Sequence, residues 1–343
     1  MLQLGWKAGT EQYTPAELLE YAVAAEDAGF DSIDASDHFH PWAEKGEACF
    51  VWSWLGAVAV KTNKIIMGTG VTCPTLRYHP AVIAQAAATV ACLAPGRFYL
   101  GVGTGEALNE YSATAQWPDY KTRQNQLAEA IELIRALWSG EKVTHKGLYY
   151  QTRQAKLYTR PREPVPIYIS SLVPNSARFA GKYGDGLITV GGEDPETYRK
   201  IFQNFEAGAR EAGKDPSRMP RMVELAVAYT DDEEKAIEYR LAYWAGTFIP
   251  ALFTERIYTP KMSEENGKVV GADTVRQSVC ISADPKTHVE FARPYIELGF
   301  DHLFFHSAGP DQRAFLQGYG RDVLPQLRQL HEERTKSAAR KSA

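Results

Sequence analysis

Short apolar runs alternate with longer amphipathic stretches along the chain, and the alternation repeats about eight times. A short continuous apolar run is typical of a strand buried on both faces, as in parallel sheets that helices cover. Eight such units predict an α/β fold, a closed (β/α)8 TIM barrel, with an open doubly wound sheet as the alternative. The predicted strands cover residues 2–9, 31–36, 64–71, 97–105, 165–172, 186–192, 222–230 and 301–309.

The amphipathic stretches between these runs predict helices. The first follows Thr14 and Pro15, has apolar spacings of three and four, and closes at Gly29. It therefore combines a Pro start with a Gly stop, which is typical of a helix. Further helices are predicted over residues 79–94, 123–138, 195–213 and 232–246.

Two connections are longer than the repeat requires, over residues 142–160 and 248–279. Long insertions in barrels usually shape or cover the site. The last residues show no apolar periodicity. We expect one barrel domain over residues 1–330, with these two insertions, and a solvated tail over residues 331–343.

The composition is that of an ordinary globular protein, with 44% apolar and 23% charged residues. A formal net charge of -4 gives no basis for nucleic-acid binding. Apolar runs such as residues 81–94 are too short to span a bilayer, and the start of the chain shows no signal-peptide pattern, so we expect a cytoplasmic protein with no membrane partner. Scattered cysteines without CxxC spacing argue against disulfides or structural zinc.

The stretch SDHFHPW, residues 36–42, follows the second predicted strand, and barrels place reacting groups at such strand ends. His38 beside Asp37 suits proton transfer, because an imidazole titrates near neutrality and a neighbouring carboxylate can orient it. Trp42 could cover a ring or donate its indole N–H. A metal site would need further ligands on later strands, but the only later imidazole there is His306, so we predict no metal.

The fourth predicted strand ends in GVGTGE, residues 101–106. The spacing GxGxG differs from the dinucleotide fingerprint GxGxxG, which also belongs in a first βαβ unit. These glycines instead give a bare backbone surface that a flat ring or a phosphate can approach. Glu106 would then point into the same barrel mouth as His38. The alternative, that the glycines only turn the strand into a helix, is weakened because the third and sixth strands also end in glycines.

The segments SDHFHPW, GVGTGEALNE, RYHPAVIAQAAATV and FFHSAGPDQRAFL together resemble the coenzyme F420-dependent dehydrogenases of the bacterial luciferase-like superfamily, over about residues 2–330. The most similar groups are the F420-dependent glucose-6-phosphate dehydrogenases and the F420-dependent secondary alcohol dehydrogenases. The resemblance implies a TIM barrel, a homodimer, and transfer of a hydride from a carbinol carbon to C5 of the deazaflavin of F420.

Position by position, the resemblance implies catalytic roles. It makes His38 the residue that exchanges the proton of the substrate hydroxyl, and Trp42 a group that stabilises the developing charge. Glu106 becomes the group near the deazaflavin that handles the proton on the cofactor side. Glu11 matches a residue that lines the substrate pocket.

The resemblance also implies where the cofactor binds. A non-proline cis peptide in the family backs the ring, and here it would join Gly70 and Val71. The other positions that match cofactor contacts are Asp37, Cys73, Thr104, Gly105, Asn109, Leu172, Val173 and Asn175.

The expected substrate follows from departures within the resemblance. The sugar-phosphate enzymes hold the phosphate with two lysines and an arginine, and the matching residues here are Glu193, Thr254 and Ser278. A phosphate dianion would meet a carboxylate where it needs a cation. With Glu11 and Val190, these residues are expected to line a pocket for a neutral secondary alcohol or a non-phosphorylated sugar.

Other functions stay open at this point. Arg256, Lys261 and Arg276 lie near the lost phosphate positions and could rebuild an anion site, as a sugar-6-phosphate dehydrogenase would require. A luciferase-like monooxygenase, which needs oxygen and FMN, is a third possibility. A cofactor carrier without catalysis is the fourth.

Overall fold

The computed structural model describes the chain from residue 2 to residue 342, with side chains described to residue 336. Eight parallel strands close into a barrel, in which β7 pairs with both β6 and β9 and β9 returns to β1. The predicted (β/α)8 TIM barrel is confirmed, and the open sheet is excluded. The barrel strands are β1 (Gln3–Ala8), β2 (Ser32–Ala35), β3 (Ile66–Thr69), β4 (Phe98–Val102), β5 (Ile167–Ser170), β6 (Gly186–Val190), β7 (Arg221–Tyr229) and β9 (His302–Ser307).

One short strand has no counterpart among the predicted strands. β8 (Cys280–Ser282) pairs with residues 227–229 at the end of β7. It therefore extends the sheet beside the closed barrel. Three residues are too few to show a hydrophobic periodicity, so the sequence pattern carries no signal for this strand.

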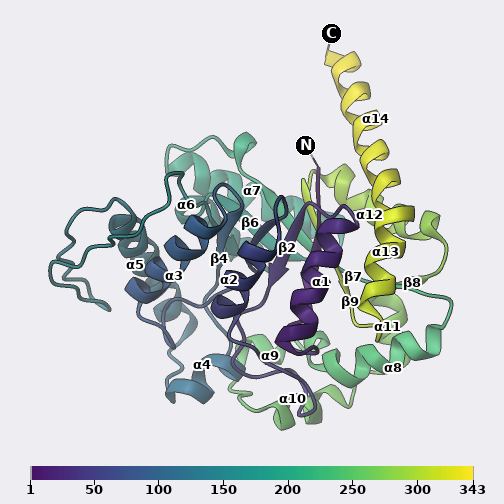
Figure 1. Cartoon of the computed structure of the whole chain (residues 1–343), viewed down its shortest axis with the longest axis horizontal. Coiled ribbons are helices and arrows are strands. Elements are labelled where there is room, and N and C mark those ends of the chain that lie inside the picture. Colours follow the sequence, from purple (N-terminus) through teal and green to yellow (C-terminus); the bar gives the residue numbers. More distant parts are fainter. Residues whose placement is uncertain (1, 343) are drawn as a thin grey trace.

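Helices surround the barrel, and their ends follow local sequence signals (Figure 1). Thr14 forms a capping box with Glu17 at the start of the first helix, and Gly29 beyond its end has a φ of 86°. The surrounding helices, which include those predicted, are α1 (Pro15–Asp27), α2 (Val51–Lys61), α3 (Pro80–Leu93), α4 (Ala107–Thr114), α5 (Tyr120–Trp138), α6 (Pro174–Tyr183), α7 (Pro195–Glu211), α8 (Glu233–Trp244), α12 (Pro285–Leu298), α13 (Gln312–Asp322) and α14 (Leu324–Ser342).

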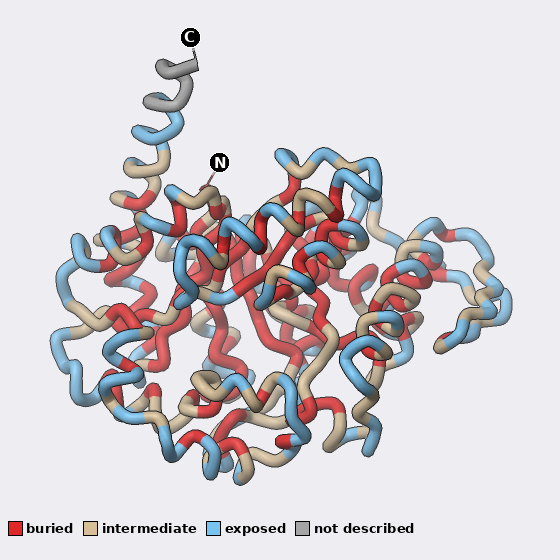
Figure 2. Tube along the Cα trace, turned by 180° about the vertical axis from the view of Figure 1, so that it is seen from behind, coloured by how far each residue is buried: buried red, intermediate tan, exposed pale blue. Residues whose placement is uncertain are grey.

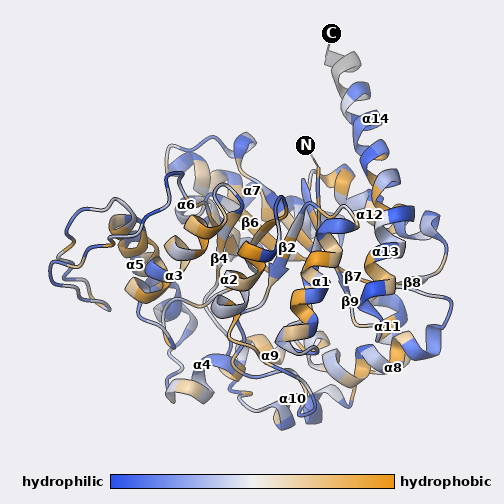
Figure 3. Ribbon diagram, in the orientation of Figure 1, coloured by the Kyte–Doolittle hydropathy of each residue, from blue (hydrophilic) through white to orange (hydrophobic). Residues whose placement is uncertain are grey.

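Most residues of the barrel strands are buried, as the red tube in the centre of Figure 2 shows, whereas the helices in Figure 3 carry both apolar and polar residues. Outward side chains such as Trp6 and Phe305 belong to the main core between strands and helices. A Cβ at Gly68 would lie 2.2 Å from the ring of Tyr99, so glycine makes room for the ring inside the barrel. The apolar layer inside the barrel consists of Tyr99, Ile188, Met222 and Phe304.

The predicted insertion over residues 248–279 folds as short helical elements between α8 and β8. They pack with Trp42 and Leu108 in a small apolar cluster apart from the main core. Trp42 follows β2 and Leu108 lies in α4, so both are beyond the carboxyl ends of strands. The insertion therefore covers the mouth of the barrel, and Figure 1 shows α4, α9 and α10 together at that end. Its elements are η2 (Ala245–Phe248), α9 (Ala251–Thr254), α10 (Pro260–Gly267) and α11 (Ala272–Ser278).

The remaining segments complete the chain. Residues 142–160 contain isolated antiparallel bridges, one of them between Val143 and Ala155. Residues 331–342 of the predicted tail continue α14, and residue 343 lies outside the described residues. The domain limits stay a prediction. Among the helices described, none is long and apolar enough to cross a membrane.

Candidate active site

His38 lies just beyond β2, and a glutamate from the loop after β1 contacts it. Its Nδ1 is 2.8 Å from Oε1 of Glu11, whose side chain is 1% exposed. The hydroxyl of Thr10 donates to the other oxygen of Glu11 at 2.9 Å. Burial raises the pKa of Glu11, but His38, Lys7 and Thr10 lower it by more, to about 2. An ionised carboxylate at Nδ1 favours a proton on that nitrogen and leaves Nε2 for proton exchange.

Asp37 is not the partner of His38, so the prediction that this carboxylate orients the imidazole is wrong. One oxygen of Asp37 accepts hydrogen bonds from Thr72 at 2.9 Å and from Trp52 at 3.3 Å. The other accepts from Tyr78 at 3.0 Å. Adjacent side chains of an extended segment point to opposite sides, so Asp37 turns into the barrel wall where His38 turns away from it. Asp37 fixes the loop that carries His38.

Glu106 approaches His38 from the start of α4. Its Oε2 lies 3.8 Å from Nε2 of His38. The side-chain amide of Asn109 donates to the same oxygen at 3.4 Å. The side-chain oxygen of Asn109 accepts from the backbone N–H groups of Phe39 and His40 at 2.8 Å and 3.1 Å. The structure thus brings Glu106 and His38 together, as the strand-end pattern predicts. The hydrogen bonds of Asn109 connect Glu106 to the loop that carries His38.

Trp42 closes one side of this group. Its ring centroid is 5.5 Å from that of His38, with the two planes at 73°. Phe253, from the insertion, meets the indole at 5.9 Å between centroids. Trp42 is 4% exposed, so it shields one side of the imidazole from water.

The environment of His38 shifts two pKa values. Burial lowers the pKa of His38, but the carboxylates of Glu11 and Glu106 raise it by more, so the net direction is upward. Burial raises the pKa of Glu106, and the attraction of His38 only partly offsets this. Paired groups with pKa values raised in this way are suited to proton exchange.

A second set of ionisable side chains lies inside the barrel at the same end, and we call Lys7, Asp34, Glu224 and His306 the charged layer. Lys7 Nζ lies 3.6 Å from Asp34 and 3.4 Å from Glu224, and it donates to the carbonyl of Gly70 at 2.5 Å. The other oxygen of Glu224 lies 3.5 Å from Nδ1 of His306. Of these four residues, the strand-end pattern predicts only His306 at the mouth. A signal existed, because Lys7 and Glu224 each interrupt an apolar run.

The glycine-rich end of β4 faces the loop after β3. The peptide bond between Gly70 and Val71 is cis, as the resemblance predicts. A Cβ at Gly103 would lie 2.8 Å from Cγ2 of Val71, and one at Gly105 would lie 2.8 Å from Sγ of Cys73. Gly105 also has a φ of 81°, which disfavours side chains. Only bare backbone fits here, and burial raises the pKa of the Cys73 thiol to about 12.

The other predicted cofactor positions lie after β4 and β5. Thr104 is in the glycine-rich loop, and Leu172 and Val173 precede α6, whose first turn includes Asn175. Val173 is 54% exposed and makes no side-chain hydrogen bond that caps the helix. The first N–H groups of a helix have no partner inside it and attract anions. This end of α6 suits a phosphate group.

The predicted substrate positions lie on separate segments. Val190 ends β6 and is 43% exposed, and Glu193 is exposed in the loop that follows. Thr254 is exposed at the end of α9, and Ser278 is partly exposed at the end of α11. Their role in the substrate pocket stays a prediction.

The three cations that could rebuild an anion site differ in their partners. Arg276 donates to Glu233 and to Asp273, so its charge is already balanced. Arg256 lies 5.8 Å from the centroid of the Tyr111 ring. Lys261 is exposed in α10.

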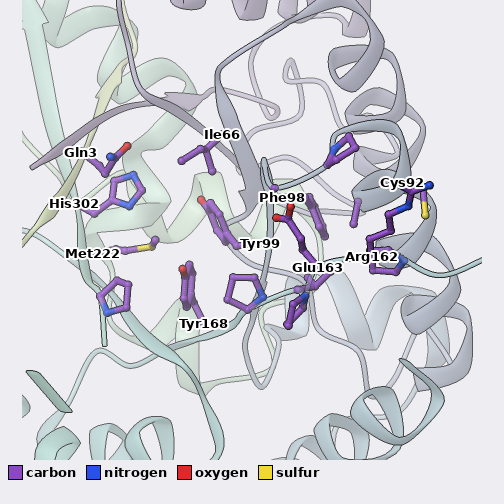
Figure 4. Close-up of a pocket in the computed structure, with 18 of the residues that line it drawn as sticks. Gln3, Ile66, Cys92, Phe98, Tyr99, Arg162, Glu163, Tyr168, Met222 and His302 are labelled. Atoms are coloured by element: carbon purple, nitrogen blue, oxygen red, sulfur yellow. The ribbon is translucent and has the colours of Figure 1, made fainter. Parts of the chain in front are cut away.

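A cavity of about 880 Å³ lies at the opposite, N-terminal end of the barrel (Figure 4). Its lining includes strand-start residues and inward rings, with Gln3, Tyr99, Tyr168, Met222 and His302 labelled in Figure 4. The predicted site residues, all of them in the described part of the chain, are absent from its lining. Because TIM-barrel sites lie at the carboxyl ends of the strands, this cavity is not the candidate active site.

Comparison with known proteins identifies the family. The family model for luciferase-like monooxygenases matches residues 2–302. The F420-dependent glucose-6-phosphate dehydrogenase of Nocardia farcinica is 44% identical over 333 residues, which cover 96% of this chain and 99% of that protein. The protein of the same name from Microbacterium testaceum is 41% identical over 329 residues, covering 95% and 98%.

Solved structures show the same relationship. An F420-dependent secondary alcohol dehydrogenase in complex with an F420-acetone adduct is 37% identical, with a TM-score of 0.90 over 95% of this chain and 99% of that one. The monooxygenase RslO1 from Streptomyces bottropensis, at 17% identity and a TM-score of 0.72, shares the fold. The chain therefore belongs to the luciferase-like family, within its branch of F420-dependent dehydrogenases.

Proposed function

We propose that the protein is an F420-dependent dehydrogenase that oxidises a neutral secondary alcohol or a non-phosphorylated sugar. The observation that carries the proposal is His38, held against the buried Glu11 on one side and facing Glu106 on the other. Such a group can take the proton of a hydroxyl and retain it. Relatives at 41% and 44% identity that are named as F420-dependent dehydrogenases support the reaction class and the cofactor.

The residues present fit F420. Gly103 and Gly105 let the loop after β4 pack closely against Val71 and Cys73 of the loop after β3. In this proposal the ring of the cofactor lies against these two loops. The start of α6 offers unpaired N–H groups to a phosphate. When bound, F420 would supply a hydride acceptor at C5 of its deazaflavin.

In this proposal His38 is the base. Its Nε2 accepts the proton of the substrate hydroxyl while the carbinol carbon gives up its hydride. Glu11 retains the proton on Nδ1 and stabilises the imidazolium that forms, in the way a buried carboxylate supports a catalytic histidine. Trp42 keeps water from one side of the ring. Glu106, held by Asn109, exchanges the proton on the cofactor side.

The charges at the mouth favour a neutral substrate. The carboxylates of Glu11 and Glu106 lie beside His38. The carboxylate of Glu224 lies beside Lys7. By the resemblance, Glu193 occupies a position at which the sugar-phosphate enzymes have a cation for the phosphate. Carboxylates repel a phosphate dianion strongly in a partly buried site. Arg276 does not reverse this balance, because two carboxylates already contact it.

A sugar-6-phosphate dehydrogenase is the second candidate. The names of the relatives from Nocardia farcinica and Microbacterium testaceum favour it. It would need the exposed Arg256 or Lys261 to turn toward the substrate.

The test offers purified protein and F420 three substrates in parallel: isopropanol, glucose and glucose 6-phosphate. The loss of the visible absorbance of oxidised F420 measures the reaction. Reduction with a neutral substrate supports the first proposal, and reduction with glucose 6-phosphate alone supports the second. Oxygen consumption with FMN and no reduction of F420 would contradict both and indicate a luciferase-like monooxygenase.

A further inference from the structure

We propose that Glu224 binds a second hydroxyl of the substrate and is the residue that selects polyhydroxylated alcohols, sugars included, over alcohols with one hydroxyl. This inference deepens the proposed function and rests on it. It names a specificity-determining residue and narrows the substrate class.

The position of Glu224 within the barrel is the first observation. Side chains of a strand alternate between faces, and Met222, two residues earlier, belongs to the apolar layer inside the barrel. Glu224 therefore also points inward. It pairs in register with Val190, the exposed last residue of β6, so it lies near the carboxyl end of that strand. This is the end of the barrel at which His38 and Glu106 meet.

The exposure of Glu224 sets it apart within the charged layer. Its side chain is 26% exposed, whereas those of Lys7, Asp34 and His306 are 5%, 1% and 1% exposed. The similar value for Glu106 is 22%, and that for His38 is 13%. Glu224 is thus the member of the charged layer that a molecule in the mouth can reach.

The carboxylate of Glu224 also has unused capacity to accept hydrogen bonds. Lys7 lies 3.4 Å from one oxygen and also donates a shorter hydrogen bond to the carbonyl of Gly70. Apart from this contact with Lys7, no side chain of the described residues donates a hydrogen bond to this carboxylate. A carboxylate offers about four lone-pair sites, so it can accept from a ligand hydroxyl.

The tautomer of His306 reinforces this conclusion. Nη1 of Arg240 lies 3.1 Å from Nδ1 of His306. A guanidinium can only donate, so Nδ1 must accept, and the proton of the neutral ring lies on Nε2. Burial, with Arg240, lowers the pKa of His306 to about 4, so the ring is neutral at neutral pH. His306 therefore gives no hydrogen bond from Nδ1 to Glu224, although the two are 3.5 Å apart.

The chemistry of this arrangement determines which ligand it accepts. Burial raises the pKa of Glu224, but nearby cations, Lys7 first among them, lower it by more. The ionised carboxylate accepts hydrogen bonds but cannot donate one. A polyol can donate a hydroxyl to it while a neighbouring carbinol faces His38. An alcohol with one hydroxyl would place alkyl carbon against the carboxylate and leave it without a partner. Sites built to bind a hydroxyl discriminate strongly against analogues that lack it.

The experiment compares isopropanol with glycerol, because both have a three-carbon skeleton with a central carbinol and only glycerol has flanking hydroxyls. The readout is kcat/KM for F420 reduction in the wild-type protein and in Glu224→Gln. We expect the wild type to prefer glycerol, and the variant to lose about 10- to 100-fold in kcat/KM with glycerol while changing less than about threefold with isopropanol. Glu234→Gln, an exposed carboxylate of α8, is the matched control and should leave both values unchanged.

The outcomes distinguish a failure of the role of Glu224 from a failure of the proposed function. A wild type that prefers isopropanol, or a variant with an unchanged ratio of the two kcat/KM values, overturns the role of Glu224 and leaves the proposed function standing. Absence of F420 reduction with every alcohol and sugar, while F420 still binds, overturns the proposed function itself. If Glu224→Gln no longer binds F420 by fluorescence titration, Glu224→Asp, which keeps a charge beside Lys7, replaces it with the same expected loss for glycerol.

Discussion

Two layers inside the same barrel have opposite chemistry. The apolar layer of Tyr99, Ile188, Met222 and Phe304 is 1–7% exposed and fills the barrel with rings and aliphatic side chains. The charged layer, one step nearer the mouth, places several ionisable groups in a dry environment. Burying charges costs several kcal/mol per ion before pairing offsets it. We infer from this difference that the apolar layer stabilises the fold, and it supports the proposal that the charged layer and the residues above it serve the reaction.

Lys7 illustrates how a buried member of the charged layer keeps its charge. Burial lowers the pKa of Lys7, but Asp34 and Glu224 raise it by more, so the ammonium group persists at neutral pH. Asp34, with Lys7, is almost fully enclosed, and Glu224 is the partner that reaches the mouth. A binding site needs a group that the ligand can reach and buried neighbours that hold this group in place. Glu224, held by the buried Lys7, meets both requirements.

Replacing His38 with Ala should have the largest effect on activity. Turnover should fall by about 10² to 10⁴, because the base is lost, while F420 affinity changes little. The free energy of unfolding should also fall, because the buried carboxylate of Glu11 loses its partner. Steady-state F420 reduction, fluorescence titration of F420 and urea denaturation measure the three quantities.

His40→Ala is the matched control, because His40 lies in the same loop. It donates to Asn109 through its backbone N–H, which the substitution keeps. Its turnover should stay within about threefold of the wild type. Equal losses in the two variants would mean that the loop, and not the imidazole of His38, limits the reaction.

The fold was predictable because it depends on local patterns. Continuous apolar runs flanked by amphipathic helices specify strands covered on both faces, and eight of them specify a barrel. Strand-end chemistry likewise places His38 and Glu106 in one mouth, since every parallel strand of a barrel ends there. β8 was not predictable, because a three-residue strand is held by its pairing with β7 and carries no pattern of its own.

The partners of the site residues were less predictable. The neighbour of His38 in sequence, Asp37, faces the wall, and its partner in space, Glu11, comes from a different loop. The side chain that contacts the imidazole depends on how the loops after β1 and β2 pack against each other. This packing involves residues far apart in the sequence, so no local pattern predicts it. Lys7 and Glu224 were visible as charges within apolar runs, but a single charge does not reveal which face of the strand it occupies.

Phe304→Ala tests the stabilising role of the apolar layer. Truncating a buried phenyl ring should lower the free energy of unfolding by about 3–5 kcal/mol, because the transfer free energy is lost and a cavity remains. Gly5, which pairs with Phe304 on the neighbouring strand, leaves room for this ring, since a Cβ there would lie 2.4 Å from it, and it has no side chain to fill the space. Urea denaturation measures the loss. A cost below about 1 kcal/mol would show that the layer does not carry the stability assigned to it.

Glu11→Gln tests the electrostatic coupling around His38. Oxidation requires a neutral imidazole, so turnover should rise with pH through the pKa of His38, which lies above its ordinary value. Without the Glu11 charge, burial still lowers this pKa and only Glu106 still raises it. The rising limb of the pH–rate profile should therefore move to lower pH, with a lower plateau because the ring is less well oriented. A limb that stays in place would contradict the assignment of Glu11 as the partner of His38.

Arg276→Ala should have the smallest effect, and it tests whether Arg276 takes part in an anion site. Arg276 is 48% exposed and contacts Glu233 and Asp273, and exposed ion pairs of this kind contribute about 0–1 kcal/mol. If the substrate is neutral, kcat/KM should change by less than about twofold, which steady-state kinetics with glycerol and glucose can measure. A rise of about tenfold or more in the KM for glucose 6-phosphate would instead show that Arg276 leaves its carboxylates to bind a phosphate. In that case the substrate-binding residues would include Arg276 of α11, and the insertion would take part in binding the substrate as well as covering the mouth.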